Sequence, residues 1–381
     1  MYYRDCLALI HIAHIVLNFD VGGLENGVVN ILNRLPSSRY RHSIICLTGY
    51  NPIFFDRIDQ AKVQIYRLDK RPGKDLGYLV KLWRLLKQLR PDIVHTRNLC
   101  TLECQLAAWF GGIKHRIHGE HGWDSEAAKG DSKPANIRKL FSPLVSHYIT
   151  LSREGEKYLI DKTHIQVQRI SRICNGVDVD KFCPDQRTQS PKMLTIGTVG
   201  RLAEVKNQQL LIRAFARLLA LNVSTPSALA LVIIGEGSCR NELQSLIDEL
   251  GLNEHCTLAG NRHDIPQAMQ ELDIYVQSSK AEGISNTILE AMASGLPIIS
   301  TDVGGARELV NDQLNGIIIG NNDESQLVNA LNLYVNTPEI RLLHGRASRE
   351  LSEQAFSLDS MTQQYDRVYQ MFSPQLSPQK L

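Results

Sequence analysis

Short apolar runs alternate with helix-like apolar patterns along most of the chain. The first run, Leu7–Leu17, precedes a segment in which apolar residues recur at helical spacing as far as Leu35. A second series of the same kind starts at Met193–Gly200, after the proline-containing linker Phe182–Lys192. Strands that alternate with helices favour parallel, doubly wound sheets. A length of 381 residues suggests two domains, so the pattern predicts a two-domain α/β protein.

One stretch of the second half places acidic residues where such folds bind ligands. The run Ile274–Ser279 predicts a short buried strand, and helical spacing follows until Gly295 and Pro297. Glu282 is therefore expected at the carboxyl end of a strand, and Glu290 about two helical turns later. In open α/β sheets, ligands bind at the carboxyl ends of the strands.

Two interpretations of these glutamates are open. In the functional one, the helix N-terminus between them binds phosphate through free N–H groups and its dipole, and the carboxylates accept hydrogen bonds from sugar hydroxyls. In the structural one, Thr287 and Glu290 form a capping box and Glu282 is a solvated loop acid. These residues alone favour neither interpretation.

The whole segment Glu282–Pro297 carries a resemblance that favours function. Written E-G-x-x-N-x-x-x-E-A-M-A-x-G-x-P, it is similar to the donor-binding signature of the family 4 retaining glycosyltransferases, which have the GT-B fold. The resemblance implies that Glu282 holds hydroxyls of the donor sugar and Glu290 those of the ribose. Backbone groups implied to lie at the donor phosphates are those of Gly283, Ile284, Ser285 and Asn286.

A second motif supplies positive charge. The segment Gly200–Lys206 resembles the G-R-L-x-x-x-K element of the same family, whose arginine and lysine hold the donor diphosphate. Arg201 and Lys206 would stabilise the charge that gathers on the leaving nucleoside diphosphate, without a metal ion. Cations at a helix start oppose the helix dipole, so a purely structural role explains them poorly. The resemblance also places the loop with Arg262 and Ile265 beside the base.

Glycines lie at two predicted strand-to-helix turns, where a dinucleotide-binding fold would carry its glycine motif. Gly22 and Gly23 let the backbone approach a phosphate, and in the family a similar pair lies against the donor. The G-x-G-x-x-G spacing of a dinucleotide site is absent there, and Gly235–Gly237 lacks the third glycine. These departures argue against a Rossmann dehydrogenase.

Histidines recur every three residues in the segment His115–Asp124. A strand would direct His115 and His121 to opposite faces, which argues against a zinc triad. The family places a histidine from the end of a T-x-H strand at the donor sugar; His121 fits that position best, and His118 is second. Candidates for acceptor contact, at the ends of two predicted strands, are Arg97, Asn98, Glu120 and Asp124.

Charge is unevenly distributed although the net charge is only +2. Residues 1–175 contain 26 Lys and Arg against 16 Asp and Glu, a balance of +10, and residues 176–381 contain 16 against 24, a balance of −8. The basic half suggests an anionic partner, either the inner membrane surface or a lipid-linked pyrophosphate acceptor; ordinary surface charge is the alternative. The basic, leucine-rich helix predicted over Leu76–Leu89 suits membrane contact, and equally suits a helix that covers the sheet.

The eight cysteines are scattered, mostly inside apolar runs. They indicate reduced thiols in a cytoplasmic protein, and they lack the spacing of a zinc site. We expect no metal and no bound cofactor, only a nucleotide sugar as co-substrate. No apolar run reaches transmembrane length, and Leu7–Leu17, which is interrupted by His11 and His14, is predicted to be a strand rather than a signal peptide.

Resemblance to the family extends over nearly the whole chain and implies the GT-B architecture. We expect two Rossmann-like domains that face a cleft, residues 1–185 on the acceptor side and 186–355 on the nucleotide-sugar side. The terminal helix and tail, 356–381, would cross back to the first domain. The strings 19–27, 70–77 and 117–124 resemble, more narrowly, the sugar transferases associated with exosortase and exopolysaccharide gene clusters.

These signals together predict transfer of a hexosyl group from a nucleoside diphosphate sugar, with UDP favoured, and with retention of configuration. The expected acceptor is lipid-linked or a glycan, in bacterial surface-polysaccharide synthesis, and nucleic acid is not an expected partner. Two alternatives stay open. One is a GT-B-shaped nucleotide-sugar epimerase. The other is an inactive subunit of a polysaccharide assembly complex, against which the intact charged residues of both motifs argue.

Overall fold

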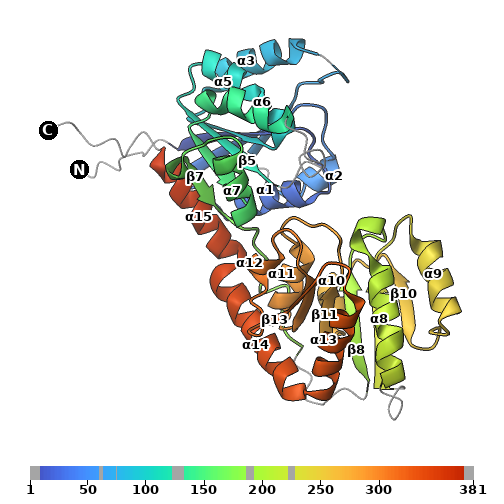
Figure 1. Cartoon of the computed structure of the whole chain (residues 1–381). Helices are drawn as coiled ribbons and strands as arrows, with labels where there is room; N and C mark the ends of the chain where they lie inside the picture. The colour runs from blue at the N-terminus through green and yellow to red at the C-terminus, as the bar shows by residue number, and fades with distance from the viewer. Residues whose placement is uncertain are drawn as a thin grey trace. The chain divides into compact units, whose positions relative to one another are not determined.

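The computed structural model describes residues 9–59, 63–73, 75–121, 133–185, 193–221 and 228–372. It divides into two compact units (Figure 1). The first comprises residues 1–174 and 361–381, and the second comprises residues 175–360.

A parallel sheet of seven strands, in the order β3-β2-β1-β4-β5-β6-β7, forms the centre of the first unit. Its strands are β1 (Ile10–Val16), β2 (Tyr40–Cys46), β3 (Val63–Arg67), β4 (Ile93–Arg97), β5 (His115–Glu120), β6 (His147–Thr150) and β7 (Ile170–Arg172). The first strand was expected over Leu7–Leu17. Within the described residues, β1 ends at Val16 and does not include Leu17.

Helices cover both faces of this sheet. They are α1 (Gly23–Arg34), α2 (Pro52–Phe55), α3 (Gly77–Leu89), α4 (Leu99–Leu102), α5 (Cys104–Phe110), α6 (Lys133–Phe141), α7 (Arg153–Asp161) and the part of α15 (Leu358–Met371) from Met361 on, with short 3₁₀ turns η3 (Ser142–Leu144) and η4 (Val167–Arg169). Helices α3 and α5 pack against alternate residues such as Ala13 and Ile15. Helices α1 and α2 pack against the opposite face, at Val16 and Ile44.

A second parallel sheet, of six strands in the order β10-β9-β8-β11-β12-β13, forms the centre of the other unit. Its strands are β8 (Leu194–Val199), β9 (Leu229–Ile234), β10 (Cys256–Gly260), β11 (Ile274–Gln277), β12 (Ile298–Thr301) and β13 (Gly316–Ile319). Its helices are η5 (Glu204–Lys206), α8 (Gln208–Leu221), α9 (Arg240–Glu249), α10 (Ile265–Gln270), α11 (Asn286–Ala293), α12 (Ala306–Leu309), α13 (Glu324–Asn336) and α14 (Pro338–Ala355). The largest apolar core of the unit lies where α8, α9 and α13 cover one face of the sheet.

The strand order reverses beside the first strand of each unit. In the first unit β1 lies between β2 and β4, and in the second unit β8 lies between β9 and β11. The chain segments that leave two such neighbouring strands enter helices on opposite faces of the sheet, and they leave a crevice at the carboxyl edge. The prediction of an α/β protein with doubly wound parallel sheets is confirmed.

Helix α3 covers its sheet with one side and presents charge with the other. Tyr78, Leu82 and Leu86 are buried in the core, whereas Val80 and Arg84 are exposed. Covering of the sheet is therefore an established role of this helix. No helix within the described ranges is both long enough and apolar enough to cross a membrane.

Buried histidines line the face of the first sheet that α1 and α15 cover. His14 Nε2 lies 3.1 Å from His42 Nδ1, and His95 Nδ1 lies 2.8 Å from the hydroxyl of Tyr369. Burial lowers the pKa of His42 to about 3. On the opposite face of the sheet, where His11 Nε2 lies 2.8 Å from Ser43 Oγ, burial lowers the pKa of His11 to about 4. These imidazoles are therefore neutral at physiological pH and form hydrogen bonds as uncharged rings.

The neutral histidines predict that the first unit is destabilised by acid. Burial also lowers the pKa of His147 to about 4. Because each folded-state pKa lies below the unfolded value, the unfolded chain binds more protons between about pH 4 and 6.5, and the free energy of unfolding falls as the pH falls through that window. Each unit of pKa difference contributes roughly 1.4 kcal/mol. Urea unfolding should be followed by tryptophan fluorescence, since Trp83, Trp109 and Trp123 all belong to this unit.

We expect a constant urea midpoint from pH 8 to 7 and a progressive fall from pH 6.5 to 4. The double variant His11→Gln, His147→Gln should show a shallower fall, because two of the groups that gain protons on unfolding are gone. His263→Gln, at an exposed position of the second unit, is the control and should leave the slope unchanged. Parallel slopes for all three proteins would contradict this account of acid stability.

Candidate functional site

Lys206 and Glu282 meet at the point of strand-order reversal in the second unit. Lys206 ends η5, in the loop after β8, and Glu282 lies in the loop after the neighbouring strand β11. Lys206 Nζ donates a hydrogen bond of 2.7 Å to Glu282 Oε2, and both side chains are partly buried. The structure thus brings together two residues that the sequence assigned to one site.

Glycines after β9 support the loop that carries Arg201. The N–H of Gly200 donates to Ile234 O, and the N–H of Leu202 donates to Glu236 O, each at 2.9 Å. A Cβ on Gly235, whose φ is +138°, would overlap Gly200 O, and one on Gly237 would overlap Leu202 O. These glycines therefore allow two loops to approach each other, which explains the incomplete dinucleotide motif.

Arg201 itself is exposed, and its guanidinium has no hydrogen-bonding partner among the side chains described in this unit. An exposed and unpaired guanidinium is available to bind an anion.

The N-terminus of α11 is capped by Ser285. Ser285 Oγ accepts a hydrogen bond from the N–H of Ile288 at 3.3 Å and donates one to Gln277 Oε1 at 2.5 Å. Thr287 lies inside the first turn, so the proposed capping box of Thr287 and Glu290 is not formed. The structural explanation for Glu290 as a capping residue is therefore wrong.

The segment after β12 holds the loop of Glu282 in place. The N–H of Gly305 donates to Gly283 O at 3.0 Å. Gly304 has a φ of +53°, and a Cβ there would overlap the carbonyl oxygen of Glu282. A Cβ on Gly305 would overlap the side chain of Ile284. The geometry of the signature loop thus depends on a pair of glycines about twenty residues further along the chain.

Asn175 adds a contact that sequence reasoning did not foresee. Its Nδ2 donates to Asn286 Oδ1, at the first residue of α11, over 2.9 Å. An asparagine followed by glycine, as at 175 and 176, is typical of a tight turn, and that explanation requires no contact with α11. The place of this pair shortly before the linker was the available signal.

Glu290 lies on α11, and burial raises the pKa of its carboxyl to about 7, against the opposing effect of the positive charge of Lys181. A carboxyl group near half-protonation at neutral pH accepts hydrogen bonds in both states and donates one when protonated. Both properties suit recognition of a diol.

Arg262 has other partners than a bound base. Its guanidinium makes two hydrogen bonds to Asp264, at 2.9 and 2.6 Å, and two to Glu271, at 2.6 and 3.0 Å. These carboxylates fix the loop that leads to Ile265, the first residue of α10. The side chain of Arg262 is therefore engaged in holding the loop, and the loop's distance from a nucleotide base stays a prediction.

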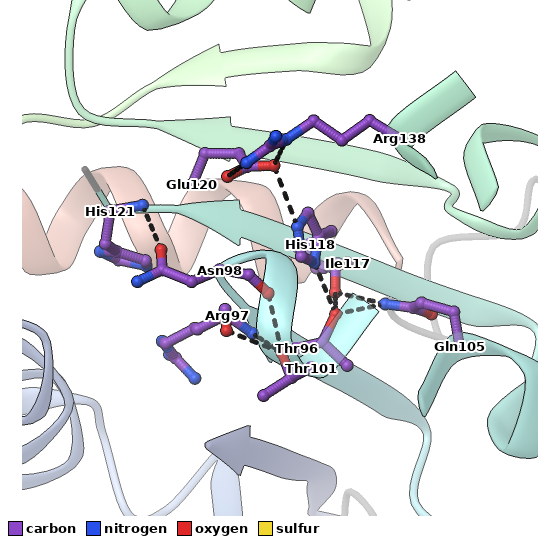
Figure 2. A network of polar contacts seen from close by, with 10 residues as sticks. All are labelled: Thr96, Arg97, Asn98, Thr101, Gln105, Ile117, His118, Glu120, His121 and Arg138. Carbon is purple, nitrogen blue, oxygen red and sulfur yellow. Dashed lines mark hydrogen bonds and ion pairs between the residues drawn. The ribbon is translucent and has the colours of Figure 1, made fainter. Parts of the chain in front are cut away.

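In the first unit, Glu120 belongs to a buried polar network that also includes His118 and Arg138 (Figure 2). Its oxygens accept hydrogen bonds from Arg138 Nε at 2.6 Å and Arg138 Nη2 at 2.9 Å, and His118 Nε2 lies 3.2 Å from Oε1. His118 Nδ1 lies 2.8 Å from Thr96 Oγ1, which accepts a hydrogen bond from Gln105 Nε2. Hydrogen bonds from Arg138 and His118 lower the pKa of Glu120 to about 2 although burial opposes them. Glu120 and His118 are thus engaged inside the unit, and Arg138 was not foreseen.

Arg97, at the end of β4, is buried, with 1% of its surface exposed. Its Nη2 lies 3.1 Å from His14 Nδ1 and 3.3 Å from His95 Nδ1. Its Nε and Nη1 have no partner among the described residues. Burial raises the pKa of Glu25, and the positive charge of Arg97 opposes this only in part.

His121 follows β5, and its ring lies over Gly119. A Cβ on Gly119 would approach His121 Nε2 to 2.6 Å, and Nε2 has no hydrogen-bonding partner in the described part of the chain. Burial, together with the charge of Arg97, lowers the pKa of His121 to about 3. Asn98 Oδ1 accepts a hydrogen bond from the N–H of His121 at 2.8 Å (Figure 2). Asp124 lies outside the described residues.

Gly22 and Gly23 begin α1, with Gly22 as the N-cap. The carboxylate of Glu25 lies over this turn, since a Cβ on Gly22 would overlap Glu25 Oε2. An acidic side chain of the protein therefore occupies the helix start at which the sequence predicted a phosphate. Among the described residues, no group of three or more His, Cys, Asp or Glu is placed to hold a metal ion.

Comparison with known proteins gives the family. The model of the glycosyl transferases group 1 matches residues 184–351, and that of Glycosyltransferase Family 4 matches residues 21–181. An uncharacterized glycosyltransferase of Methanocaldococcus jannaschii is 39% identical over 314 residues, which cover 76% of this chain and 74% of the relative. The chain belongs to the family 4 glycosyltransferases. The predicted family is confirmed, and the arginine, lysine and glutamates described above belong to a glycosyltransferase.

Further similarities extend over most of this glycosyltransferase. The UDP-Gal:alpha-D-GlcNAc-diphosphoundecaprenol alpha-1,3-galactosyltransferase of Escherichia coli is 29% identical over 341 residues, or 84% of this chain and 87% of that protein. The crystal structure of Anabaena HepE in complex with UDP superposes with a TM-score of 0.78 at 19% identity, over 95% of this chain and 100% of HepE. At that identity the likeness concerns the fold, which is GT-B as predicted.

The contact between Gly304 and Glu282 gives a sharp test of the second-unit site. Gly304→Ala should weaken binding of the donor nucleotide at least tenfold, because the new Cβ displaces the loop of Glu282 in addition to straining the backbone. Isothermal titration calorimetry with the nucleotide and urea unfolding would measure the two effects separately.

Gly251→Ala is the matched control. Gly251 has a φ of +66°, but no atom lies within 4 Å of a Cβ placed there. Its loss of stability, about 1–2 kcal/mol, comes from backbone strain alone, and its nucleotide affinity should equal that of the wild type. If the two variants bind the nucleotide with equal affinity, Gly304 does not hold the loop of Glu282 in its binding geometry.

Proposed function

We propose that this glycosyltransferase transfers a hexosyl group from a UDP-sugar to a lipid-linked acceptor, with retention of configuration and without a metal ion. The observation that carries the proposal is the Lys206–Glu282 ion pair, with the start of α11 after Glu282 in the same loop. A cation, a carboxylate and free backbone N–H groups are the donor set that a sugar diphosphate needs.

Each group has a part in the proposed reaction. Lys206 and Arg201 stabilise the negative charge that develops on the departing diphosphate. Glu282, oriented by Lys206, accepts hydrogen bonds from hydroxyls of the donor sugar, and Glu290 accepts those of the ribose. His121, whose imidazole is neutral, is proposed as a hydrogen-bonding group for the sugar.

Retention is proposed through attack on the face from which the diphosphate leaves. The attacking hydroxyl of the acceptor gives its proton to the departing phosphate, so no carboxylate nucleophile is needed. Glu282 is held by Lys206, which suits a residue that binds hydroxyls better than one that forms a covalent bond to the sugar.

Relatives support the choice of substrates. The name of the E. coli relative includes UDP-Gal as donor and a diphosphoundecaprenol-linked sugar as acceptor, and HepE was crystallised with UDP. A relative in Campylobacter jejuni, 35% identical over 207 residues, or 53% of this chain and 54% of that protein, is also named for a diphospho-undecaprenol acceptor. We therefore propose that this enzyme acts in synthesis of a bacterial exopolysaccharide or other surface glycan, on the cytoplasmic side of the membrane.

Lys206→Ala should lower the turnover number at least 100-fold, because it removes a fixed cation from the leaving group and leaves Glu282 without its partner. Turnover should be measured with a panel of UDP-, GDP- and ADP-sugars and a diphosphoundecaprenol-linked sugar, with magnesium and with a chelator. Lys280→Ala is the control, since it breaks an exposed Lys–Glu pair of similar length, 2.9 Å to Glu204, in the same unit.

Three outcomes would overturn parts of the proposal. Normal turnover in Lys206→Ala would remove that residue from the site. Conversion of the nucleotide sugar with no acceptor added would indicate an epimerase. The absence of both turnover and thermal stabilisation by any nucleotide, in a protein that is folded, would indicate an inactive subunit.

We also propose that the outer side of α3 contacts anionic lipid. Trp109 and Phe110, at the end of α5, are 50% and 66% exposed, and Trp83 Nε1 donates to Phe110 O at 3.3 Å, which joins the two helices. Lys87 Nζ lies 4.7 Å from the centre of the Trp83 ring. Aromatic rings beside cations suit the headgroup region of a membrane, which is where a lipid-linked acceptor lies.

The double variant Arg84→Glu, Lys87→Glu should bind vesicles containing phosphatidylglycerol at least tenfold more weakly than the wild type, since each cation near such a surface contributes about 1 kcal/mol. Co-sedimentation at low and high salt would measure this binding. The control reverses two exposed arginines of the second unit, Arg213→Glu and Arg346→Glu. Equal loss in both double variants would indicate general charge attraction and would reject a specific role for α3.

A further inference from the structure

Asn98 has a backbone conformation that is unusual for its residue type. It follows β4 and precedes α4, with φ 60° and ψ 164°. This region of φ and ψ is populated almost only by glycine, and other residues persist there only when their surroundings impose it. Strain of this kind is concentrated at functional sites.

Thr101 provides the surroundings that impose this conformation. Its hydroxyl accepts a hydrogen bond from the N–H of Arg97 at 2.8 Å and donates one to Arg97 O at 2.7 Å. The N–H of Thr101 donates to Asn98 O at 3.1 Å. Thr101 is fully buried, so the turn between β4 and α4 is fixed on both sides of Asn98.

The side chain of Asn98 does not perform the usual task of an asparagine at a helix start. Asparagine is among the preferred N-cap residues, yet Asn98 makes no side-chain hydrogen bond to α4. Its Oδ1 accepts from the N–H of His121, 23 positions along the chain, at 2.8 Å (Figure 2). Its own N–H donates to Gly119 O, also at 2.8 Å. Asn98 thus holds the end of β5 at two points.

The position of the His121 ring depends on this part of the backbone. The ring lies over Gly119, where there is room only because that residue lacks a Cβ. Its Nε2 is buried and has no partner in the described residues. A change in the exit direction of β5 would therefore move the whole imidazole.

We propose that Asn98 is a positioning residue for His121: through Oδ1 it fixes the direction in which the chain leaves β5, and so the place of the imidazole. The proposal rests on the proposed function, in which His121 binds the donor sugar. It also assigns Asn98 a task different from direct contact with the acceptor, which the sequence had suggested. A residue that acts through another should affect turnover without forming a contact of its own with substrate.

Two substitutions separate the contributions of Asn98. Asn98→Gly removes Oδ1 and relieves the backbone strain, so stability should be unchanged or higher while the turnover number falls at least tenfold. Asn98→Asp keeps an acceptor oxygen in the same place and replaces only the NH₂ group, so turnover should stay within about threefold of the wild type. Initial rates with a UDP-sugar would give kcat and KM, and urea unfolding would give stability.

A double-mutant cycle with His121→Ala tests whether the effect passes through the histidine. If Asn98 acts by positioning His121, Asn98→Gly should cause no further loss of turnover in the His121→Ala background. Losses that multiply in the double variant, or normal turnover in Asn98→Gly alone, would overturn the proposal. Loss of activity in Asn98→Asp would overturn it as well and would indicate that the amide group touches substrate.

Failure of the proposed function gives a different result. If His121→Ala has normal turnover, the role of His121 itself is rejected, whatever the Asn98 variants show. If His121→Ala is impaired and Asn98→Gly is not, the role of His121 stands and only the positioning role of Asn98 is rejected.

Discussion

The Lys206–Glu282 hydrogen bond, 2.7 Å long, joins two loops that leave neighbouring strands and then turn away from each other. Parallel strands with helices on both faces produce one such point of divergence where the strand order reverses. In the second unit that point lies between β8 and β11. The loops of Arg201 and Glu282 lie side by side only because of this strand order, and their other contacts, with Gly235 and Gly304, keep them there.

Several glycines in this unit allow neighbouring loops to approach each other closely. Gly235 and Gly237 allow the loop after β9 to touch the loop of Arg201, and Gly304 and Gly305 allow the loop after β12 to touch the loop of Glu282. Each of the two charged loops is thus supported by its outer neighbour in the sheet. Without these contacts, the two loops that carry the ion pair would be irregular and mobile segments. The conformational entropy lost on ordering them would then reduce the net contribution of the ion pair to stability.

The first unit has the same kind of parallel sheet, with a reversal of strand order beside its first strand. Its polar residues at the sheet are buried, whereas those of the second unit form a partly exposed ion pair. The face of its sheet beneath α15 carries a buried cation, Arg97, among neutral histidines. A buried charge with few partners is unfavourable for stability. Burial lowers the pKa of the neighbouring histidines, and the charge of Arg97 lowers it further; His121 is one of them. Arg97 and His121 lie at the carboxyl ends of β4 and β5, where the scaffold can hold their positions more rigidly than a surface loop could.

The sequence by itself determined the order of strands and helices, the two-domain α/β class and the family, because apolar periodicity and signature motifs are properties of short segments. Its motifs also propose Arg201, Lys206, Glu282 and Glu290 as site residues. Only the tertiary structure decided three local arrangements around candidate residues: Ser285 rather than Thr287 as the cap of α11, Arg138 as the partner of Glu120, and Asn98 as the partner of His121. Each of these pairs, apart from the cap, joins positions far apart in the chain. The contact of Asn98 with His121 follows from the pairing of β4 with β5, and that of Arg138 with Glu120 from the placement of α6 beside β5; local pattern specifies neither.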